Sequence, residues 1–197
     1  MNARVVLGLD LSVRALGLCA VESTWDLRWD RTRACTLEVP LTADEIGRAH
    51  TLRLMALARD VRVFAVRVGA TDVWAEDIGF FDRTRIKSAI QLAELRSAVR
   101  VELERECGLT LRFVQSSSAR KLLYGVQPPK GLSYGQRKAW LLEPLRLAGA
   151  PFEDDAQGDA FCVANYALSE LGAPCLAHIL GTPELKPKAK RMRKVAA

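Results

Sequence analysis

The chain has 197 residues, a length that suits one domain with a sizeable core and is short for two. About half of the residues are apolar, yet no apolar run approaches the roughly 18 residues that a membrane span needs, and the N-terminus shows no secretory leader. The net charge of +6 favours a polyanionic partner such as nucleic acid. We therefore expect a cytoplasmic globular protein with no membrane partner.

The first third of the sequence predicts three strands and a helix. Three apolar segments separated by polar turns predict an antiparallel meander. The segment 42–68 then has apolar residues at helical spacing, and Thr42 with Glu45 three positions later has the pattern of a helix cap. The three predicted strands are residues 4–10, 15–22 and 33–39.

Strands and helices alternate in the remainder of the chain. The predicted strands are 71–77 and 109–114, and the predicted helices are 83–106, 116–123, 134–147 and 155–171. Gly108 ends the first of these helices, and Pro151 separates the last one from its predecessor. This order predicts an α/β domain with a mixed sheet flanked by helices, and it leaves the order of the strands open.

Four acidic residues occur at the ends of apolar strands and at the start of the last helix, where they call for an explanation. Asp10 and Glu76 each end an apolar strand, and Asp155 and Asp159 lie four residues apart at the start of the last helix, so they share one helical face. Carboxylates that converge repel one another, and divalent cations bound through oxygen relieve the repulsion. The set therefore predicts a metal site.

Each acid also has a plain structural explanation. Asp10 can cap a turn, and Glu76 or Asp77 can face solvent. Asp154 or Asp155 can cap the last helix, and we expect Asp154 to be the cap and Asp155 the ligand.

Other residue types offer little catalytic material. The five cysteines are scattered without a C-x-x-C pair, and only two histidines are present. This composition disfavours a zinc site or a histidine-centred triad, so the expected chemistry rests on carboxylates.

Three segments in chain order, "VLGLDLSVRALGLCAVE", "VWAEDIGFF" and "DDAQGDAFCVANYAL", resemble the RuvC-type Holliday junction resolvases of the RNase H-like superfamily. The resemblance covers about residues 4–172 and implies a mixed five-stranded sheet, with three antiparallel strands followed by two parallel ones. It also implies an RNase H-like nuclease domain over residues 1–181 and leaves 182–197 as a basic, flexible tail. The tail and two departures from the family pattern, Leu11-Ser12 after the first Asp and the four-residue spacing of the last acidic pair, indicate a phage-type or divergent member.

The resemblance implies a crossover junction endodeoxyribonuclease that nicks opposed strands symmetrically and leaves 5′-phosphate and 3′-hydroxyl ends. Asp10, Glu76, Asp155 and Asp159 would hold two Mg²⁺ ions, with Mn²⁺ as a substitute. Arg120 or Lys121, and Arg137 or Lys138, would take the places of two family lysines, and Lys121 and Lys138 are the expected catalytic cations. The implied setting is the bacterial cytosol or nucleoid, or a phage-infected cell.

The implied partners are branched DNA, in particular a four-way junction, and a second copy of the chain. The helix 83–106 is the expected dimer and DNA face, and Phe80 and Phe81 are expected to stack at an opened junction. Core packing for the phenylalanines and solvation for the charges are the plain alternatives. The further expected DNA contacts are Arg83, Arg85, Lys87, Arg96, Arg100, Arg120, Lys121, Lys130, Arg137 and Lys138.

Three other functions remain open from the sequence. The same acids would serve a nuclease acting on flaps or RNA–DNA hybrids, and a degenerate site would leave a junction-binding protein without activity. An actin-like kinase or ATPase begins with a similar strand, but the sequence has no phosphate-binding G-x-x-x-x-G-K motif.

Overall fold

The computed structural model describes residues 4–12, 15–23, 29–38, 48–77, 86–126, 128–177 and 179. The strands are β1 (Val5–Asp10), β2 (Ala15–Glu22), β3 (Thr32–Glu38), β4 (Asp72–Glu76) and β5 (Leu111–Val114). A 3-10 turn, η1 (Trp29–Arg31), precedes β3. The helices are α1 (Arg48–Val68), α2 (Ile86–Cys107), α3 (Ser116–Tyr124), α4 (Tyr134–Leu147) and α5 (Asp155–Glu170).

The five strands form one mixed sheet in the order β3-β2-β1-β4-β5. The first three strands pair antiparallel, and β4 and β5 pair parallel to β1 and to each other. The predicted RNase H-like sheet, with three antiparallel strands followed by two parallel ones, is confirmed. Because β1 and β4 are parallel neighbours, their carboxyl ends lie at the same edge, which brings Asp10 and Glu76 to one place.

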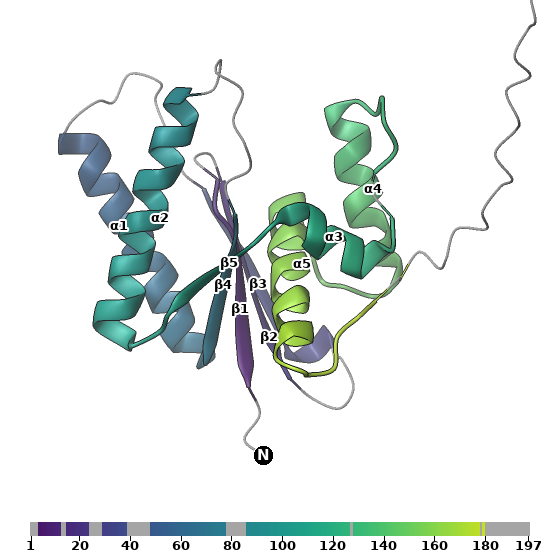
Figure 1. Cartoon of the computed structure of the whole chain (residues 1–197), viewed down its shortest axis with the longest axis horizontal. Helices are drawn as coiled ribbons and strands as arrows, with labels where there is room; N and C mark the ends of the chain where they lie inside the picture. Colours follow the sequence, from purple (N-terminus) through teal and green to yellow (C-terminus); the bar gives the residue numbers. More distant parts are fainter. Residues whose placement is uncertain are drawn as a thin grey trace, which may run out of the picture.

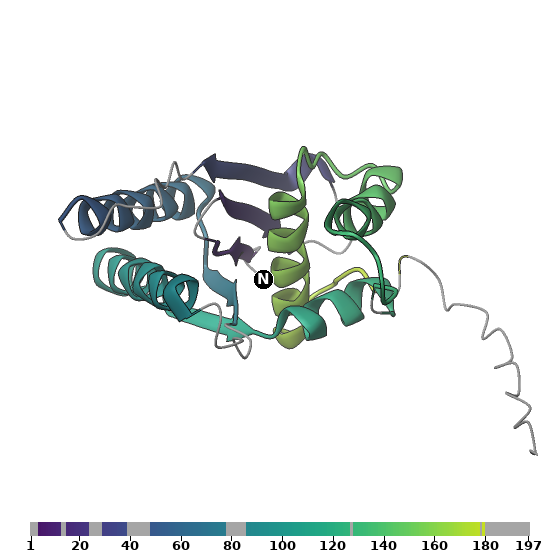
Figure 2. The same cartoon turned by 90° about the horizontal axis from the view of Figure 1, so that it is seen from above.

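Helices cover both faces of this sheet (Figures 1 and 2). One face carries α1 and α2, and the other carries α5 with α3 and α4 beyond it. Side chains that alternate along β1 divide between the two cores: Val6 packs on the α5 side, whereas Leu7 and Leu9 pack on the α1 and α2 side. By the same alternation, Asp10 belongs to the α5 side.

Two glycines bring α5 close to the sheet. A Cβ at Gly8 would lie 2.1 Å from the carbonyl oxygen of Ala160, and a Cβ at Gly17 would lie 2.0 Å from that of Ala156. Since neither position can hold a side chain, the first turns of α5 lie directly on β1 and β2. This close packing carries the acids of α5 toward the end of β1.

The helix and strand boundaries in the described residues match the sequence predictions within a few positions. The predicted helix start at Thr42 and Glu45 falls outside the described residues, as does the tail 182–197. Within the part of the chain that the structure describes, no helix is both long and apolar enough to cross a bilayer.

Candidate active site

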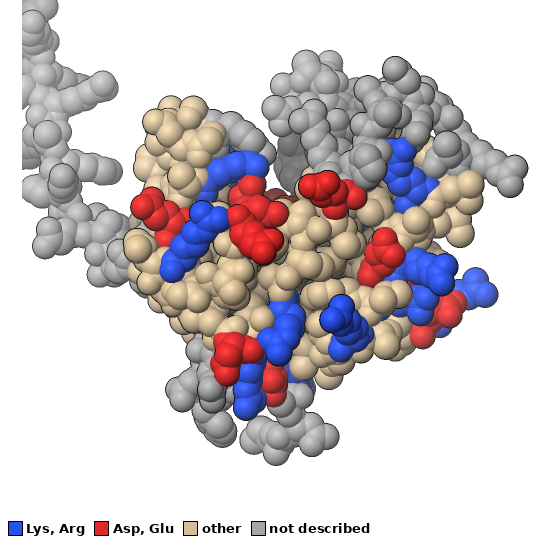
Figure 3. All heavy atoms as spheres, turned by 180° about the vertical axis from the view of Figure 1, so that it is seen from behind, with Lys and Arg blue, Asp and Glu red and all other residues tan. Residues whose placement is uncertain are grey.

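A cavity of about 590 Å³ opens where the carboxyl ends of β1 and β4 meet the start of α5. Acidic side chains gather at the upper edge of the molecule as seen from behind, with basic side chains beside them (Figure 3). The cavity brings together all four acids that the sequence predicts as metal ligands. Its lining comprises Asp10, Ser12, Ala15, Thr36, Glu38, Glu76, Arg120, Arg137, Lys138, Leu141, Asp154, Asp155, Ala156 and Asp159.

The two acids on strands have no close polar partner. Among the described residues, no hydrogen bond or ion pair reaches the carboxylate of Asp10 or Glu76. Burial raises the pKa of Asp10 well above its usual value, and the carboxylates of Asp159 and Glu76 raise it further, while Arg120 offsets part of the effect. Negative charge at the end of β1 is therefore only partly compensated within the chain.

The two acids on α5 are each paired with a cation. Arg120 of α3 donates from Nε to Oδ1 of Asp159 at 3.0 Å and from Nη2 to Oδ2 at 2.8 Å. Lys138 of α4 donates from Nζ to Oδ1 of Asp155 at 2.6 Å. These pairs tie α3 and α4 to the acidic face of α5.

The pKa values of the Arg120–Asp159 pair reflect the surrounding carboxylates. Burial raises the pKa of Asp159, Arg120 lowers it, and the carboxylate of Glu76 raises it again. The net result is a pKa of about 6. Burial lowers the pKa of Arg120, but Asp159 and Glu76 outweigh that effect and leave it above its usual value. The guanidinium therefore remains charged, while the carboxylate beside it titrates near pH 6.

The structure distinguishes the roles of Asp154 and Asp155. Asp154 Oδ1 accepts from the backbone N–H of Gln157 at 2.9 Å, and its Oδ2 accepts from the Thr36 hydroxyl at 2.6 Å. Both oxygens of Asp154 are thus engaged, and the prediction that this residue caps α5 is confirmed. Asp155, one residue on, lines the cavity with one oxygen on Lys138.

The predicted basic residues divide between the cavity and the outer surface. Arg120, Arg137 and Lys138 line the cavity, whereas Lys121 and Lys130 are exposed and are not among its lining residues. Of the alternatives Arg120 or Lys121, the structure thus places Arg120 at the acids.

The remaining predicted DNA contacts have different outcomes. Phe80, Phe81, Arg83 and Arg85 lie outside the described residues, as does the side chain of Lys87 within α2. The prediction that Arg96 lies on a DNA face is wrong: its side chain is buried against Phe113 and Asp77. Arg100 is exposed on α2 and pairs with Glu104.

Sequence reasoning missed three polar side chains of the cavity, Ser12, Thr36 and Glu38. Thr36 is opposite Gly17 on β2, and Gly17 is opposite Asp10 on β1, so only the strand register reveals that Thr36 faces the site. Ser12 follows β1 by two residues, and its hydroxyl accepts from the backbone N–H of Ala15 at 3.2 Å.

The donor set suits a divalent metal ion in its chemistry. The four acids predicted as ligands share one cavity with two further carboxylates, those of Glu38 and Asp154, and hard cations such as Mg²⁺ prefer oxygen ligands. As the described side chains stand, however, no three His, Cys, Asp or Glu residues form a group positioned to hold an ion. Two of the acids are engaged by Arg120 and Lys138 instead.

No protein-family model matches the chain, and no curated protein sequence matches it. Solved structures do. RuvC of Thermus thermophilus in complex with a Holliday junction substrate is similar with a TM-score of 0.60 and 16% identity, over 88% of this chain and 99% of RuvC. A second T. thermophilus RuvC structure is similar with a TM-score of 0.61 and 18% identity, over 87% of this chain and 99% of that chain.

The yeast mitochondrial Holliday junction resolvase Ydc2 is similar with a TM-score of 0.52 and 14% identity, over 81% of this chain and 75% of Ydc2. The likeness to RuvC extends over nearly the whole of that chain and most of this one. This chain therefore has the fold of the RuvC-type Holliday junction resolvases.

Proposed function

We propose that the protein is a metal-dependent endodeoxyribonuclease that resolves four-way DNA junctions by nicking opposed strands, with 5′-phosphate and 3′-hydroxyl products. The observation that carries this proposal is the cavity in which the four acids predicted as metal ligands lie together with three cations, in a chain with the RuvC fold. One similar structure is described as a complex with a Holliday junction substrate, which supports branched DNA as the ligand.

Asp10, Glu76, Asp155 and Asp159 would hold two Mg²⁺ ions, which Mn²⁺ can replace. When bound, such a pair of ions would activate water and stabilise the leaving oxygen of a phosphodiester. Asp10 stands between the acid of β4 and the acids of α5, so it is the residue best placed to serve both ions.

The basic side chains of the cavity would hold the DNA backbone. Arg137 lines the cavity, and its guanidinium has no hydrogen bond or ion pair with any described residue, so it is available to a phosphate. Arg120 and Lys138 are engaged by the acids of α5 and would turn to phosphate oxygens as cations replace them. The carboxylates and the basic groups thus change partners together when DNA and metal bind.

A symmetric dimer would supply the second cut. A four-way junction has two-fold symmetry, so two copies related by a two-fold axis would present a site to each of two opposed strands. The face formed by α1 and α2 is suited to this contact because apolar side chains on it are exposed, including Met55 at 60% and Ile90 at 55%.

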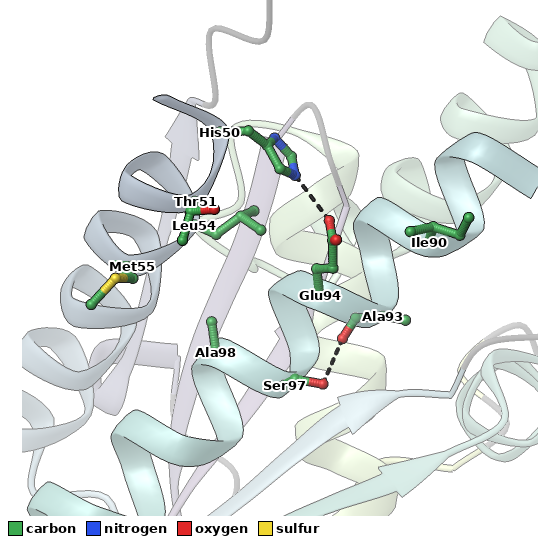
Figure 4. A pocket seen from close by; sticks show the side chains of 9 residues that line it. All are labelled: His50, Thr51, Leu54, Met55, Ile90, Ala93, Glu94, Ser97 and Ala98. Carbon is green, nitrogen blue, oxygen red and sulfur yellow. Dashed lines mark hydrogen bonds and ion pairs between the residues drawn. The ribbon is translucent and has the colours of Figure 1, made fainter. Parts of the chain in front are cut away.

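Between the two helices, His50 Nε2 and Glu94 Oε2 lie 3.0 Å apart beside a pocket of about 500 Å³ (Figure 4). Met55 and Ile90 line the same pocket from opposite helices. We expect Met55→Glu and Ile90→Glu to shift the protein toward monomer in sedimentation equilibrium. Leu147→Glu on α4, at a residue that is 83% exposed, is the control and should leave the assembly unchanged.

The function is tested with a synthetic four-way junction and a linear duplex of matching sequence, each with Mg²⁺, Mn²⁺ or EDTA. We expect paired nicks on opposed strands of the junction, with either metal and not with EDTA. A flap and an RNA–DNA hybrid in the same assay test the alternative nucleases. Equal cutting of junction and duplex, or cutting in EDTA, would contradict the proposal, and junction binding without any cutting would indicate an inactive binding protein.

A further inference from the structure

A cluster of side chains around the buried Arg96 lies on the opposite face of the sheet from the acidic cavity, at the end of β4. Glu76 and Asp77 are consecutive, and strand alternation sends them to opposite faces. Glu76 lines the cavity, whereas Asp77 meets Arg96 of α2, with its Oδ1 3.4 Å from Nη1. The end of β4 is therefore held from the α2 side while it presents an acid on the α5 side.

Three further contacts fix the backbone at this point. The N–H of Asp77 donates to the carbonyl oxygen of Val114 at 2.6 Å and extends the pairing of β4 with β5 by one residue. Gln115 donates from Nε2 to Asp77 Oδ2 at 2.8 Å, so both oxygens of this carboxylate are engaged. A strand end secured in this way has little freedom to rotate the preceding residue.

Arg96 is the central member of the cluster. It is only 8% exposed, and its guanidinium lies over the ring of Phe113, 4.9 Å from the ring centroid. Its Nε is buried without a hydrogen-bond partner in the described part of the chain. The ion pair with Asp77 and the contact with the Phe113 ring offset part of the cost of burying this charge.

We infer that Arg96 is a positioning residue for Glu76: by holding Asp77 on one face of the sheet, it keeps the Glu76 carboxylate aimed into the cavity on the other. This inference rests on the proposed metal-binding role of Glu76. Residues that orient a metal ligand from outside the coordination shell commonly change metal affinity by about 10- to 100-fold when they are replaced.

The test compares Arg96→Met with Arg100→Met. Both changes remove a guanidinium from α2, but Arg100 is 57% exposed on the side chain and pairs only along its own helix, with Glu104. Mn²⁺ binding to the protein without DNA is measured by electron paramagnetic resonance. We expect Arg96→Met to weaken it about tenfold, Arg100→Met to leave it within twofold, and Arg96→Lys to recover part of the loss.

Two measurements separate positioning from unfolding. Asp77→Asn removes the charge that Arg96 holds, so in the Arg96→Met background it should add little to the loss of Mn²⁺ affinity. Junction binding in Ca²⁺ should stay within twofold for the Arg96 and Asp77 variants that are folded by circular dichroism. Unchanged Mn²⁺ affinity in a folded Arg96→Met protein would overturn the inference, as would an equal loss in Arg100→Met.

The outcome does not depend on cleavage. If the wild-type protein binds Mn²⁺ but fails to cut junctions, the proposed function is wrong and the Mn²⁺ titration still decides the role of Arg96. If the wild-type protein cuts junctions and Arg96→Met keeps the native Mn²⁺ affinity, the function stands and the positioning role is wrong.

Discussion

The acids carried by strands and those carried by the helix α5 reach the same cavity in different electrostatic states. Asp155 and Asp159 are each held by a cation from a neighbouring helix. Asp10 and Glu76 have no such partner among the described residues. Each acid of α5 thus has a cation beside it that offsets part of its charge, whereas neither strand acid has one in the described part of the chain.

This difference indicates where a bound cation would contribute most. A buried carboxylate without a partner destabilises the folded state. A divalent ion that binds there removes this destabilisation, and the free energy regained strengthens metal binding. The pairs on α5 would instead have to be broken before their acids can act as ligands. We therefore expect the strand acids to dominate metal affinity and the helix acids to control its accessibility.

Replacing Asp10 should give the largest effect of all. Asp10→Asn keeps the shape of the side chain but removes a ligand shared by both proposed ions, so cleavage should fall by about 10³-fold or more. Junction binding in Ca²⁺ should persist, because the cations of the cavity remain. Cleavage is measured on a labelled four-way junction at saturating Mg²⁺, and near-native activity would remove Asp10 from the site.

The same variant should be more stable than the native protein without metal. The raised pKa of Asp10 shows that its charge is disfavoured in the fold, so a neutral side chain should raise Tm in EDTA by roughly 2–8 °C. Asp155→Asn is the matched control, because it breaks a partly exposed ion pair of small energetic value and should give no increase. A higher Tm in Asp155→Asn than in Asp10→Asn would show that the helix acid, not the strand acid, destabilises the fold more.

The pH dependence of stability provides a second test. The pKa of Asp159 is about 6 in the fold, above the ordinary value of an aspartate, so its contribution to stability is present at low pH and is lost as pH rises through 6. In EDTA, we expect Tm to fall by several degrees between pH 5 and pH 7.5. Metal binds the ionised carboxylates, so the increase in Tm caused by Mg²⁺ should grow over the same interval.

Asp159→Asn should flatten the decline of Tm in EDTA over this interval, because the group that titrates near pH 6 is gone. A native Tm that rises steadily from pH 5 to pH 7.5 in EDTA would show that burial of Asp159 does not control stability there. Differential scanning calorimetry at low ionic strength measures both proteins under the same conditions.

Much of the fold could be predicted because it depends on local patterns. Apolar runs that end in Asp10 and Glu76 predict two strands, and four-residue spacing predicts the acidic face of α5. The close approach of α5 to the sheet could not be predicted in this way. It depends on Gly8 and Gly17 lying opposite backbone atoms of α5, and hydrophobic periodicity carries no such information.

The ion pairs inside the cavity could not be predicted either, because they too depend on how distant parts of the chain pack. Arg120 and Asp159 are 39 residues apart and meet only through the packing of α3 on α5. Arg96 was misplaced because charged residues occur all around α2, so the sequence does not show which of them is buried. Its neighbour Leu95 is 1% exposed, and this places Arg96 at the margin of the core rather than on the open face.

The smallest expected effect concerns Arg120, the cation that is paired with Asp159 of α5. Arg120→Gln frees both oxygens of Asp159, whereas Arg137→Gln removes the same charge from the same cavity without breaking any ion pair of the described residues. Both changes should favour Mn²⁺ binding without DNA through reduced repulsion. If the Arg120 pair limits access to the acids, Arg120→Gln should increase Mn²⁺ affinity several-fold more than Arg137→Gln.

Linkage gives the comparison a second readout. In the native protein, a junction that draws Arg120 onto a phosphate should increase Mn²⁺ affinity, and Mn²⁺ should increase junction affinity by the same factor. With Arg120→Gln, the pair no longer has to break, so this reciprocal factor should shrink toward one. A factor that stays at its native value would show that Asp159 is available to metal without any movement of Arg120, and the helix acids would then be equivalent to the strand acids.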